Sequence, residues 1–267
     1  MQTTPAPDGA TDDALLTVFD LQLRQRARPD GPSATVERSG GVLRQVGPGH
    51  VWNGVLWSRL TESDADAEIA AQVRHFASLG HAWEWKLYAH DRPADLGQRL
   101  LAAGFEAEPA ETVMVARIAD LPHASEPPAG ITLHPVTDEA GVELVALVHD
   151  RAFGNGSARF GERLLAQFAE APDSVTAVVA MAGDLPVSAA RMDFHLGTEF
   201  ASLWGGGTVP EWRGRGIYRA LIAYRARIAA ERGYRYLQVD ASDQSRPILQ
   251  RLGFVPLTVT TPYVREP

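Results

Sequence analysis

The sequence predicts an α/β (α+β) protein made of two similar units that follow one another along the chain. Strand-like and helix-like segments alternate through most of its 267 residues, which is typical of α/β architecture. One block occurs twice: residues 87–105 and residues 237–254 each have the pattern of a strand, a polar loop, a short helix and a final Gly-Phe. This repetition indicates a duplicated α/β unit; chance recurrence of a short pattern is the alternative.

Composition and charge narrow the class of protein. Hydrophobic residues make up 45% of the chain and charged residues 22%, as in ordinary globular proteins. The chain has no cysteine, which excludes disulfides, a thiolate nucleophile and cysteine-bound metal centres. Its eight histidines form no HExxH motif or close pair, so no metal site is expected. The net charge of −8 argues against a nucleic-acid partner.

The start of the chain shows no targeting signal. Residues 1–12 lack the basic and apolar regions of a secretory leader and are expected to form a flexible tail. No run of 18 apolar residues occurs, so neither a membrane-spanning helix nor a membrane partner is expected. The protein is therefore expected to be cytoplasmic, and the sequence does not specify its oligomeric state.

The first unit is expected at residues 13–120, followed by a linker at 121–130 that contains two adjacent prolines. Helical periodicity predicts helices over residues 13–27, 64–79 and 95–103. Strand-like patterns occur over residues 34–39, 42–47, 51–60, 83–90 and 111–118.

The second unit is expected at residues 131–267. Strands are predicted over residues 131–136, 175–183, 186–195, 200–209, 234–241 and 255–264. Helices are predicted over residues 137–153, 160–171, 212–233 and 246–252. Thr137 is the expected N-cap of the first of these helices, because a threonine oxygen can accept a hydrogen bond from a first-turn N–H group.

The turn between strand 200–209 and helix 212–233 carries the strongest functional signal. Gly214 and Gly216 allow the backbone to bend with little side-chain obstruction. The first N–H groups of a helix have no partner within it and lie at the positive end of its dipole, so they can bind phosphate. Three arginines add positive charge: Arg213, Arg215 and Arg219. A pyrophosphate site is therefore predicted, and a plain glycine turn with arginines in water is the alternative.

This segment resembles motif A of the Gcn5-related N-acetyltransferase (GNAT) superfamily, whose pattern is Arg/Gln-x-x-Gly-x-Gly/Ala. Arg213 and Gly216 match the pattern, whereas Tyr218 stands where Gly or Ala is usual. The resemblance covers residues 131–267. Residues 30–120 look like a second, degenerate GNAT unit, as in tandem acetyltransferases.

The resemblance implies that each unit has a mixed, mostly antiparallel central sheet flanked by helices. It implies acetyl-CoA or another acyl-CoA as co-substrate, with no metal. Thr208 and Val209 would hydrogen-bond the pantetheine arm, and Ser242 stands where relatives often carry an Asn. The pyrophosphate would lie on the turn and first helical residues: Arg213, Gly214, Arg215, Gly216, Ile217, Tyr218 and Arg219. The thioester would enter between strands 199–209 and 234–241.

The implied activity is N-acyltransfer from CoA to an amine of a small molecule or peptide, by direct attack in a ternary complex. Glu199 and Asp240 are the candidate bases; a strand-edge carboxylate and a loop cap are the respective alternatives. Leu249 occupies the position at which many relatives carry a Tyr that protonates the leaving thiolate. Tyr218 or Tyr263 could donate a proton, or could be core aromatics. The missing acid leaves open a non-catalytic acyl-CoA-binding or regulatory protein.

Overall fold

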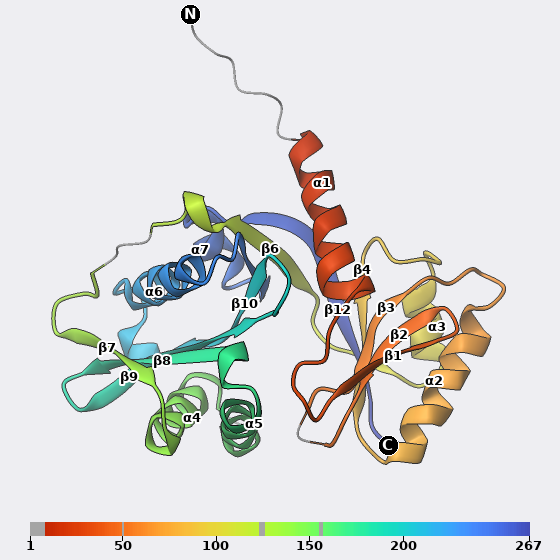
Figure 1. The fold of residues 1–267 in the computed structure, drawn as a ribbon, viewed down its shortest axis with the longest axis horizontal. Coiled ribbons are helices and arrows are strands. Elements are labelled where there is room, and N and C mark those ends of the chain that lie inside the picture. Colours follow the sequence, from red (N-terminus) through yellow and green to blue (C-terminus); the bar gives the residue numbers. More distant parts are fainter. Residues whose placement is uncertain (1–8, 50, 123–125, 155–156) are drawn as a thin grey trace, which may run out of the picture.

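The computed structural model describes residues 9–49, 51–122, 126–154 and 157–267. The first eight residues of the predicted tail and part of the predicted linker lie outside this described part. Within it, twelve strands form one continuous sheet that runs through both halves of the molecule (Figure 1). The strand order is β1-β2-β3-β4-β12-β6-β11-β10-β9-β8-β7, and the short β5 also pairs with β12.

The N-terminal half contains three α-helices and six strands among its described residues. The helices are α1 (Gly9–Phe19), continued by the π-helical segment Asp20–Gln25, α2 (Ala65–Leu79) and α3 (Leu96–Ala102). The strands are β1 (Thr35–Ser39), β2 (Val42–Val46), β3 (Gly54–Ser58), β4 (Trp83–Tyr88), β5 (Glu106–Ala107) and β6 (Glu111–Arg117). The predicted helices and strands of this half are present with shifted ends.

The C-terminal half continues the sheet with six strands and four α-helices among its described residues. The strands are β7 (Ile131–Val136), β8 (Val175–Ala182), β9 (Leu185–Phe194), β10 (Phe200–Thr208), β11 (Tyr236–Ala241) and β12 (Val255–Arg265). The helices are α4 (Glu139–Phe153), α5 (Ser157–Glu170), α6 (Ile217–Glu231) and α7 (Arg246–Arg251). Within the described residues, no helix has the length and apolar character needed to span a membrane.

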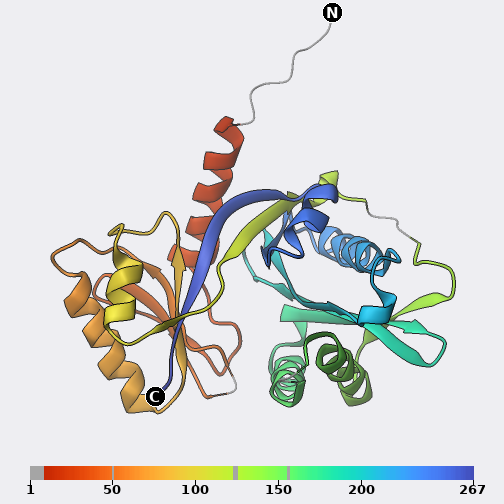
Figure 2. The same cartoon turned by 180° about the vertical axis from the view of Figure 1, so that it is seen from behind.

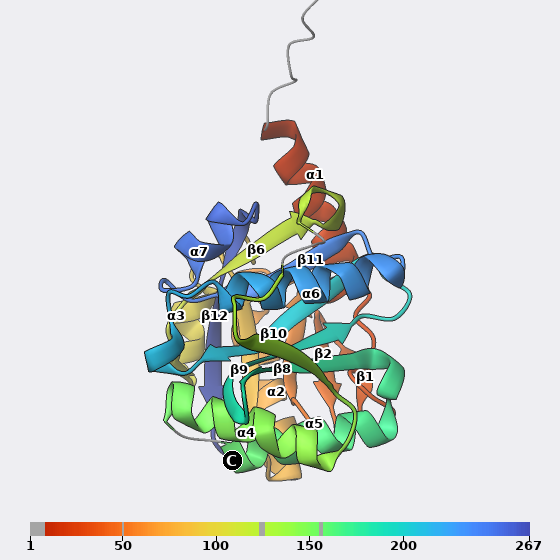
Figure 3. The same ribbon diagram turned by 90° about the vertical axis from the view of Figure 1, so that its left-hand side faces the viewer.

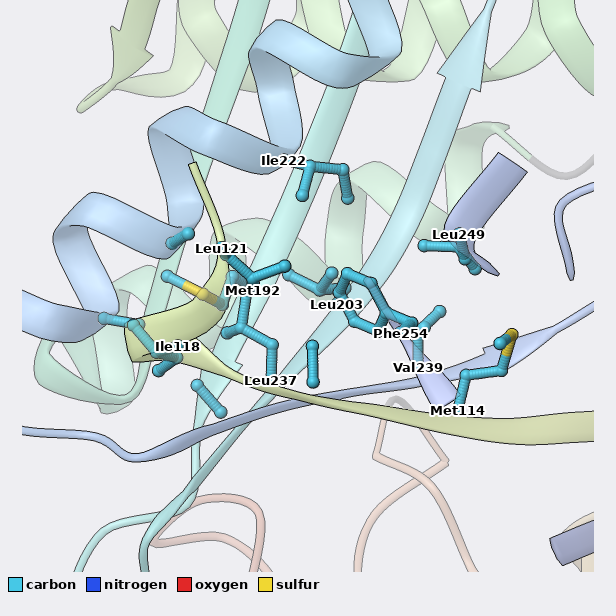
Figure 4. Packing of buried hydrophobic residues seen from close by; sticks show 14 of the residues in the cluster. Met114, Ile118, Leu121, Met192, Leu203, Ile222, Leu237, Val239, Leu249 and Phe254 are labelled. Carbon is cyan, nitrogen blue, oxygen red and sulfur yellow. The ribbon is translucent and has the colours of Figure 1, made fainter. Parts of the chain in front are cut away.

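Helices cover both faces of the sheet in the C-terminal half (Figure 3). On one face, Ile222 of α6 and Leu249 of α7 pack with strand residues such as Met192, Leu203 and Leu237 (Figure 4). On the other face, α4 and α5 pack on β8 and β9. The face that carries α4 and α5 is called the α4/α5 face below.

Each half contains one parallel pair of strands joined by a helix. In the N-terminal half β3 and β4 pair in parallel, with α2 between them in sequence. In the C-terminal half β10 and β11 pair in parallel, with α6 between them. A short helix, α3 or α7, follows the second strand of each pair. The repeated block of the sequence therefore corresponds to β4–α3 in one half and β11–α7 in the other.

The two halves exchange their last strands. Strand β6, from the N-terminal half, pairs antiparallel with β11 from Thr112 to Arg117. Strand β12, from the C-terminal half, pairs with β6 through its first residues and with β4 through its last ones. Figure 2 shows β12 as the long blue strand that passes from one half to the other, with β6 beside it. The domain boundaries at residues 120 and 131 stay a prediction.

Two predicted helix starts are wrong. Asp138, rather than Thr137, caps α4: its backbone is extended, and its side chain accepts a hydrogen bond of 2.9 Å from the Gly141 N–H. Helix α6 begins at Ile217 instead of residue 212, because Gly214 and Gly216 have φ values of +74° and +85°. Such a left-handed backbone cannot be part of a right-handed helix.

Candidate functional site

Strands β10 and β11 pair over only three residues and then separate. The paired positions are Phe200–Ser202 on β10 and Tyr236–Gln238 on β11. Beyond them β10 stays paired with β9 as far as Thr208, and β11 stays paired with β6 as far as Ala241. The edges of β10 and β11 that face each other therefore have no strand partner beyond Ser202 and Gln238. This place is called the β10/β11 fork below.

A bulge of three glycines shapes the β10 side of the fork. The register between β10 and β9 shifts between Trp204 and Gly207, and Gly205 has a φ of +58°, which favours glycine. Side chains of neighbouring elements lie close to this backbone. A Cβ on Gly205 would lie 3.2 Å from the Phe160 ring, and a Cβ on Gly207 would lie 2.8 Å from the Phe153 ring. The start of α5 and the end of α4 therefore cover the bulge.

The turn from β10 into α6 presents backbone N–H groups without partners. No side chain caps the N-terminus of α6. Within the described residues, the N–H groups of residues 214–219 have no hydrogen-bond acceptor. A Cβ on Gly214 would have no atom within 4 Å, so the space beside this turn is open. Free donors, open space and the positive end of a helix dipole fit a pyrophosphate group.

The three arginines predicted at this turn are not equivalent. Arg213 donates from Nε to the Thr208 carbonyl (3.0 Å) and from Nη2 to the Ala152 carbonyl (3.2 Å). It therefore ties the end of β10 to the end of α4. The Arg215 guanidinium lies 4.5 Å from the centre of the Trp212 ring, and Arg219 is exposed. Arg215 and Arg219 thus retain more freedom than Arg213 to meet a phosphate.

An ion pair between the two halves lies at the fork. Lys86 of β4 donates to Asp240 of β11, although β12 and β6 lie between their strands. The Lys86 ammonium also lies 5.3 Å from the ring centre of Trp204 on β10. Trp204 and Asp240 are each two residues beyond the last paired positions, Ser202 and Gln238. The ammonium therefore lies beside both strands where they separate.

A chain of hydrogen bonds fixes Asp240 from the side of β9. His195 Nε2 is 2.7 Å from Ser202 Oγ, Ser202 Oγ donates to Gln238 Oε1 (2.6 Å), and Gln238 Nε2 donates to Asp240 Oδ1 (2.6 Å). With Lys86 on Oδ2, both oxygens of Asp240 have a partner. The Asp240 side chain is only 1% exposed. Asp240 is thus a buried, fully bonded carboxylate at the fork.

Burial and neighbouring charges shift the pKa values of Lys86, Glu84 and Glu111 at the fork. Burial alone would lower the pKa of Lys86, but Asp240 and Glu84 beside it outweigh burial and hold the pKa above its usual value. Burial raises the pKa of Glu84, which accepts a hydrogen bond of 2.8 Å from Trp52 Nε1. Burial, with the nearby charge of Asp240, raises the pKa of Glu111 to about 7. Lys86 therefore stays a cation, while Glu111 titrates near neutral pH.

Another carboxylate, that of Asp193, lies on the opposite side of β10 from Asp240. Asp193 of β9 pairs in register with Ser202 and is ion-paired with Arg191 at 2.9 Å. Burial raises the pKa of Asp193 to about 6, and Arg191 opposes this effect. Four strands around the fork therefore each carry a carboxylate: Asp193 on β9, Asp240 on β11, Glu111 on β6 and Glu84 on β4.

Glu199, the other predicted base, precedes β10 at the end remote from the turn. It forms an ion pair with Arg235 and accepts a hydrogen bond of 2.9 Å from Gln22 Nε2. The hydrogen bond from Gln22, with the charge of Arg235, holds the pKa of Glu199 below its usual value. At about 3.3 Å per strand residue, Glu199 lies on the order of 25–30 Å from Thr208. This placement favours a structural role over a role as base.

The remaining predicted residues divide between the turn and the core. Val209 is buried and its N–H donates to the Val187 carbonyl, so that group is not free for a pantetheine arm. Ser242 follows β11 and its carbonyl accepts from the N–H groups that begin α7. Leu249 is fully buried. Tyr218 packs against the α6 core, and Tyr263 against the core of the N-terminal half.

Lys86, Glu84 and Glu111 were missed by reasoning from the sequence, because they belong to the half that lacks the glycine turn. One signal was available: Lys86 is the only lysine in a chain with 24 arginines. Within the described residues, no group of three or more His, Cys, Asp or Glu side chains is arranged to hold a metal ion.

The fork and the glycine turn before α6 define a GNAT-type α/β fold in the C-terminal half. Residues 137–254 match the model of the Acetyltransferase (GNAT) family. Among curated proteins, none matches the chain in sequence.

Solved structures share the fold over nearly the whole chain. A GCN5-related N-acetyltransferase from Kribbella flavida is 18% identical, with 98% of this chain and 97% of that chain covered and a TM-score of 0.69. A GCN5-related N-acetyltransferase from Sphaerobacter thermophilus is 16% identical, with 99% and 97% covered and a TM-score of 0.60. A tandem GNAT protein from the clavulanic acid biosynthesis pathway is 15% identical, with 98% and 97% covered and a TM-score of 0.58. The predicted fold class is confirmed.

Proposed function

We propose that the protein is an N-acyltransferase that moves an acetyl or short acyl group from CoA to an amine of a small molecule or peptide. The observation that carries this proposal is the turn before α6, where the N–H groups of residues 214–219 have no partner beside open space. Acetyl-CoA is the co-substrate of the GNAT family, and its pyrophosphate suits such a turn.

The rest of the cofactor would follow β10 from the turn toward the fork. The unpaired edge of β10 beyond Ser202 offers backbone groups to the amides of a pantetheine arm, as a neighbouring strand would. The thioester would then lie near Trp204 and Asp240. The amine would attack the thioester carbonyl directly in a ternary complex. In this proposal Thr208 hydrogen-bonds the pantetheine arm, and Ser242 takes the place of the Asn that relatives often carry. The N-terminal half is a second, degenerate GNAT unit.

A non-catalytic acyl-CoA-binding or regulatory role is the second candidate. Leu249 favours it, because a buried leucine stands where many relatives carry the acid that protonates the thiolate. Acid help is not essential for transfer, since a thiol with a pKa of about 8.5 leaves without a strong acid. The Tyr218 ring lies against the glycine bulge of β10, 3.3 Å from where a Cβ on Gly206 would be. Burial raises the pKa of Tyr218, so its hydroxyl stays protonated at neutral pH.

Thermal melting with acetyl-CoA, CoA and NAD tests the cofactor assignment. A ligand at about 100 times its dissociation constant stabilises by about 2.7 kcal/mol, which is a shift of several degrees for a chain of this size. The expected result is a shift with acetyl-CoA and CoA, and none with NAD. Gly216→Val should remove the shift.

Gly233→Val is the matched control for this variant. Gly233 follows α6 and has a φ of +81°, against +85° for Gly216, with no atom near its hypothetical Cβ. Both variants strain the backbone similarly, but only Gly216 lies at the turn before α6. A ligand shift that survives Gly216→Val would contradict the cofactor site. CoA release with a panel of primary amines then separates transferase from binding protein.

A further inference from the structure

Glu111 lies beside the fork on the strand that the N-terminal half contributes. In the register of β6 with β11, Asp240 is opposite Val113. Glu111 precedes Val113 by two residues, so its side chain lies on the same face of the sheet, diagonal to Asp240. Diagonal neighbours in an antiparallel pair are about 7–8 Å apart, within reach of long side chains. Their strand neighbours Met114 and Val239 point into the core under α6 and α7, so Glu111 and Asp240 share the opposite, α4/α5 face. Lys86 contacts both Asp240 and Trp204, which places Trp204 on this face too.

Glu111 is also at the end of β11 where the fork is widest. The last pair between β11 and β6 joins Ala241 to Thr112. Glu111 is the next residue of β6, and it pairs with Thr260 of β12 on its other side. It therefore lies alongside the end of β11, beyond the point at which β10 and β11 separate.

Its bonding distinguishes Glu111 from the other carboxylates of this region. Asp240 has a partner on each oxygen. Glu84 accepts from Trp52, and Asp193 is paired with Arg191. Among the described residues, the Glu111 carboxylate has no hydrogen-bond or ion-pair partner, and the residue is only partly buried. A carboxylate in this condition can receive a proton without breaking an existing bond.

The charged groups that face Glu111 come from three neighbouring segments. They are Asp240 on β11, Lys86 and Glu84 on β4, and Glu108 in the connection before β6. Burial, Asp240 and the two glutamates raise the pKa of Glu111, and Lys86 lowers it, with a net value of about 7. A general base is most effective with a pKa close to the working pH.

We propose that Glu111 accepts the proton of the acceptor amine, so that the N-terminal half supplies a catalytic residue to the transfer site of the C-terminal half. This inference rests on the acyl transfer proposed above. The ammonium R–NH3+ gives one proton to the Glu111 carboxylate. The neutral amine then attacks the thioester carbonyl carbon, a C–N bond forms, and the C–S bond breaks with its electron pair going to sulfur.

The remaining protons are exchanged with water. A second proton leaves the nitrogen as the amide forms, and the thiolate takes one from water to give the CoA thiol. Glu111 returns its proton to solvent before the next turnover. The net products are the amide, CoA and one proton. Asp240 and Lys86 act as positioning residues in this scheme, because they fix the charges beside Glu111.

The test is the pH dependence of CoA release, between pH 5.5 and 9.5, with an amine from the panel that the wild-type protein turns over. For the wild type, kcat/KM should rise with pH through about 7 and then level off, because the base works in its ionised form. Glu111→Gln should lower kcat/KM at pH 8 by about 10²–10⁴-fold and remove that bend. The melting shift with acetyl-CoA should remain.

Two control variants isolate Glu111. Glu108→Gln removes an exposed glutamate three residues away and should keep the rate at pH 8 while moving the bend slightly lower. Asp193→Asn tests another carboxylate with a raised pKa and should keep the bend near 7. The inference is overturned if Glu111→Gln stays within threefold of wild type, or if Asp193→Asn removes the bend. If acetyl-CoA binds but no panel amine releases CoA, the transferase proposal itself fails, and this inference with it.

Discussion

Breaking the ion pair between the halves should cost more stability than any surface ion pair of the molecule. Asp240 is 1% exposed and Lys86 is 18% exposed. Lys86→Met would leave a buried carboxylate whose remaining bond comes from Gln238. Removing one partner of a buried pair costs about 3–5 kcal/mol. At about 2–4 °C per kcal/mol, the midpoint of thermal unfolding should fall by about 6–20 °C at pH 8.

Two comparisons make this prediction specific to the buried pair. Lys86→Met with Asp240→Leu should recover most of the loss, since replacing both partners of a buried pair by apolar residues is often neutral or stabilising. Arg227→Met breaks the exposed pair with Glu231, whose side chains are 47% and 58% exposed, and should cost less than about 1 kcal/mol.

The stability that the Lys86–Asp240 pair contributes should depend on pH in one direction only. The pKa of Lys86 is raised, so its contribution to stability is complete below the usual lysine pKa and is lost only as the pH rises through the raised value. Wild-type stability should therefore not change through this group between pH 5 and 9. A loss below about 1 kcal/mol in Lys86→Met at pH 8, as for an exposed pair, would refute the reasoning.

Three further outcomes are expected. Gly205→Ala should lower the free energy of unfolding, measured in urea, by more than Gly183→Ala does. Both positions have φ near +58°, but only the new Cβ at Gly205 would meet a ring, that of Phe160 at 3.2 Å. Equal losses would show that the Phe160 ring moves aside. Glu111→Gln should stabilise the protein more at pH 8 than at pH 5. The pKa of Glu111 is raised, so the folded state binds the extra proton below about pH 7 and wild-type stability falls as the pH rises through that range; chemical unfolding at both pH values checks this. Glu199→Gln should change CoA release by less than threefold and stability by less than about 1 kcal/mol, with the stability difference vanishing in acid because the pKa of Glu199 is lowered; a large loss of turnover would restore Glu199 as a base.

Local patterns in the sequence were sufficient for most helices and strands. The apolar spacing within residues 64–79 predicts α2, which spans Ala65–Leu79, because one face of a helix must be buried. The glycine turn before α6 was equally readable, since Gly214 and Gly216 have the left-handed φ values that glycine allows. What local patterns cannot report is which strands pair across long separations.

The exchange of β6 and β12 illustrates this limit. Residues 111–117 read as an ordinary strand, and nothing in their spacing indicates β11 as a neighbour. For the same reason Lys86 and Glu111 could not be assigned to a site near residue 240. Asp240 was predicted as a candidate base, yet the bonds that occupy both of its oxygens come from Gln238 and from a lysine 154 positions earlier. Its role stays a prediction, and the free carboxylate of Glu111 is the better placed proton acceptor.

The path of β12 has a consequence for the order in which the protein can be completed on the ribosome. Strand β4 has its final neighbour only after residue 265 has been made, and β6 must wait for β11. At about 5–20 residues per second, the edge of β4 stays unpaired for about 10–35 seconds of synthesis. An open sheet edge readily pairs with another chain. Growing chains should therefore depend on chaperones that shield the edge of β4, and slowing translation after residue 120 should increase aggregation.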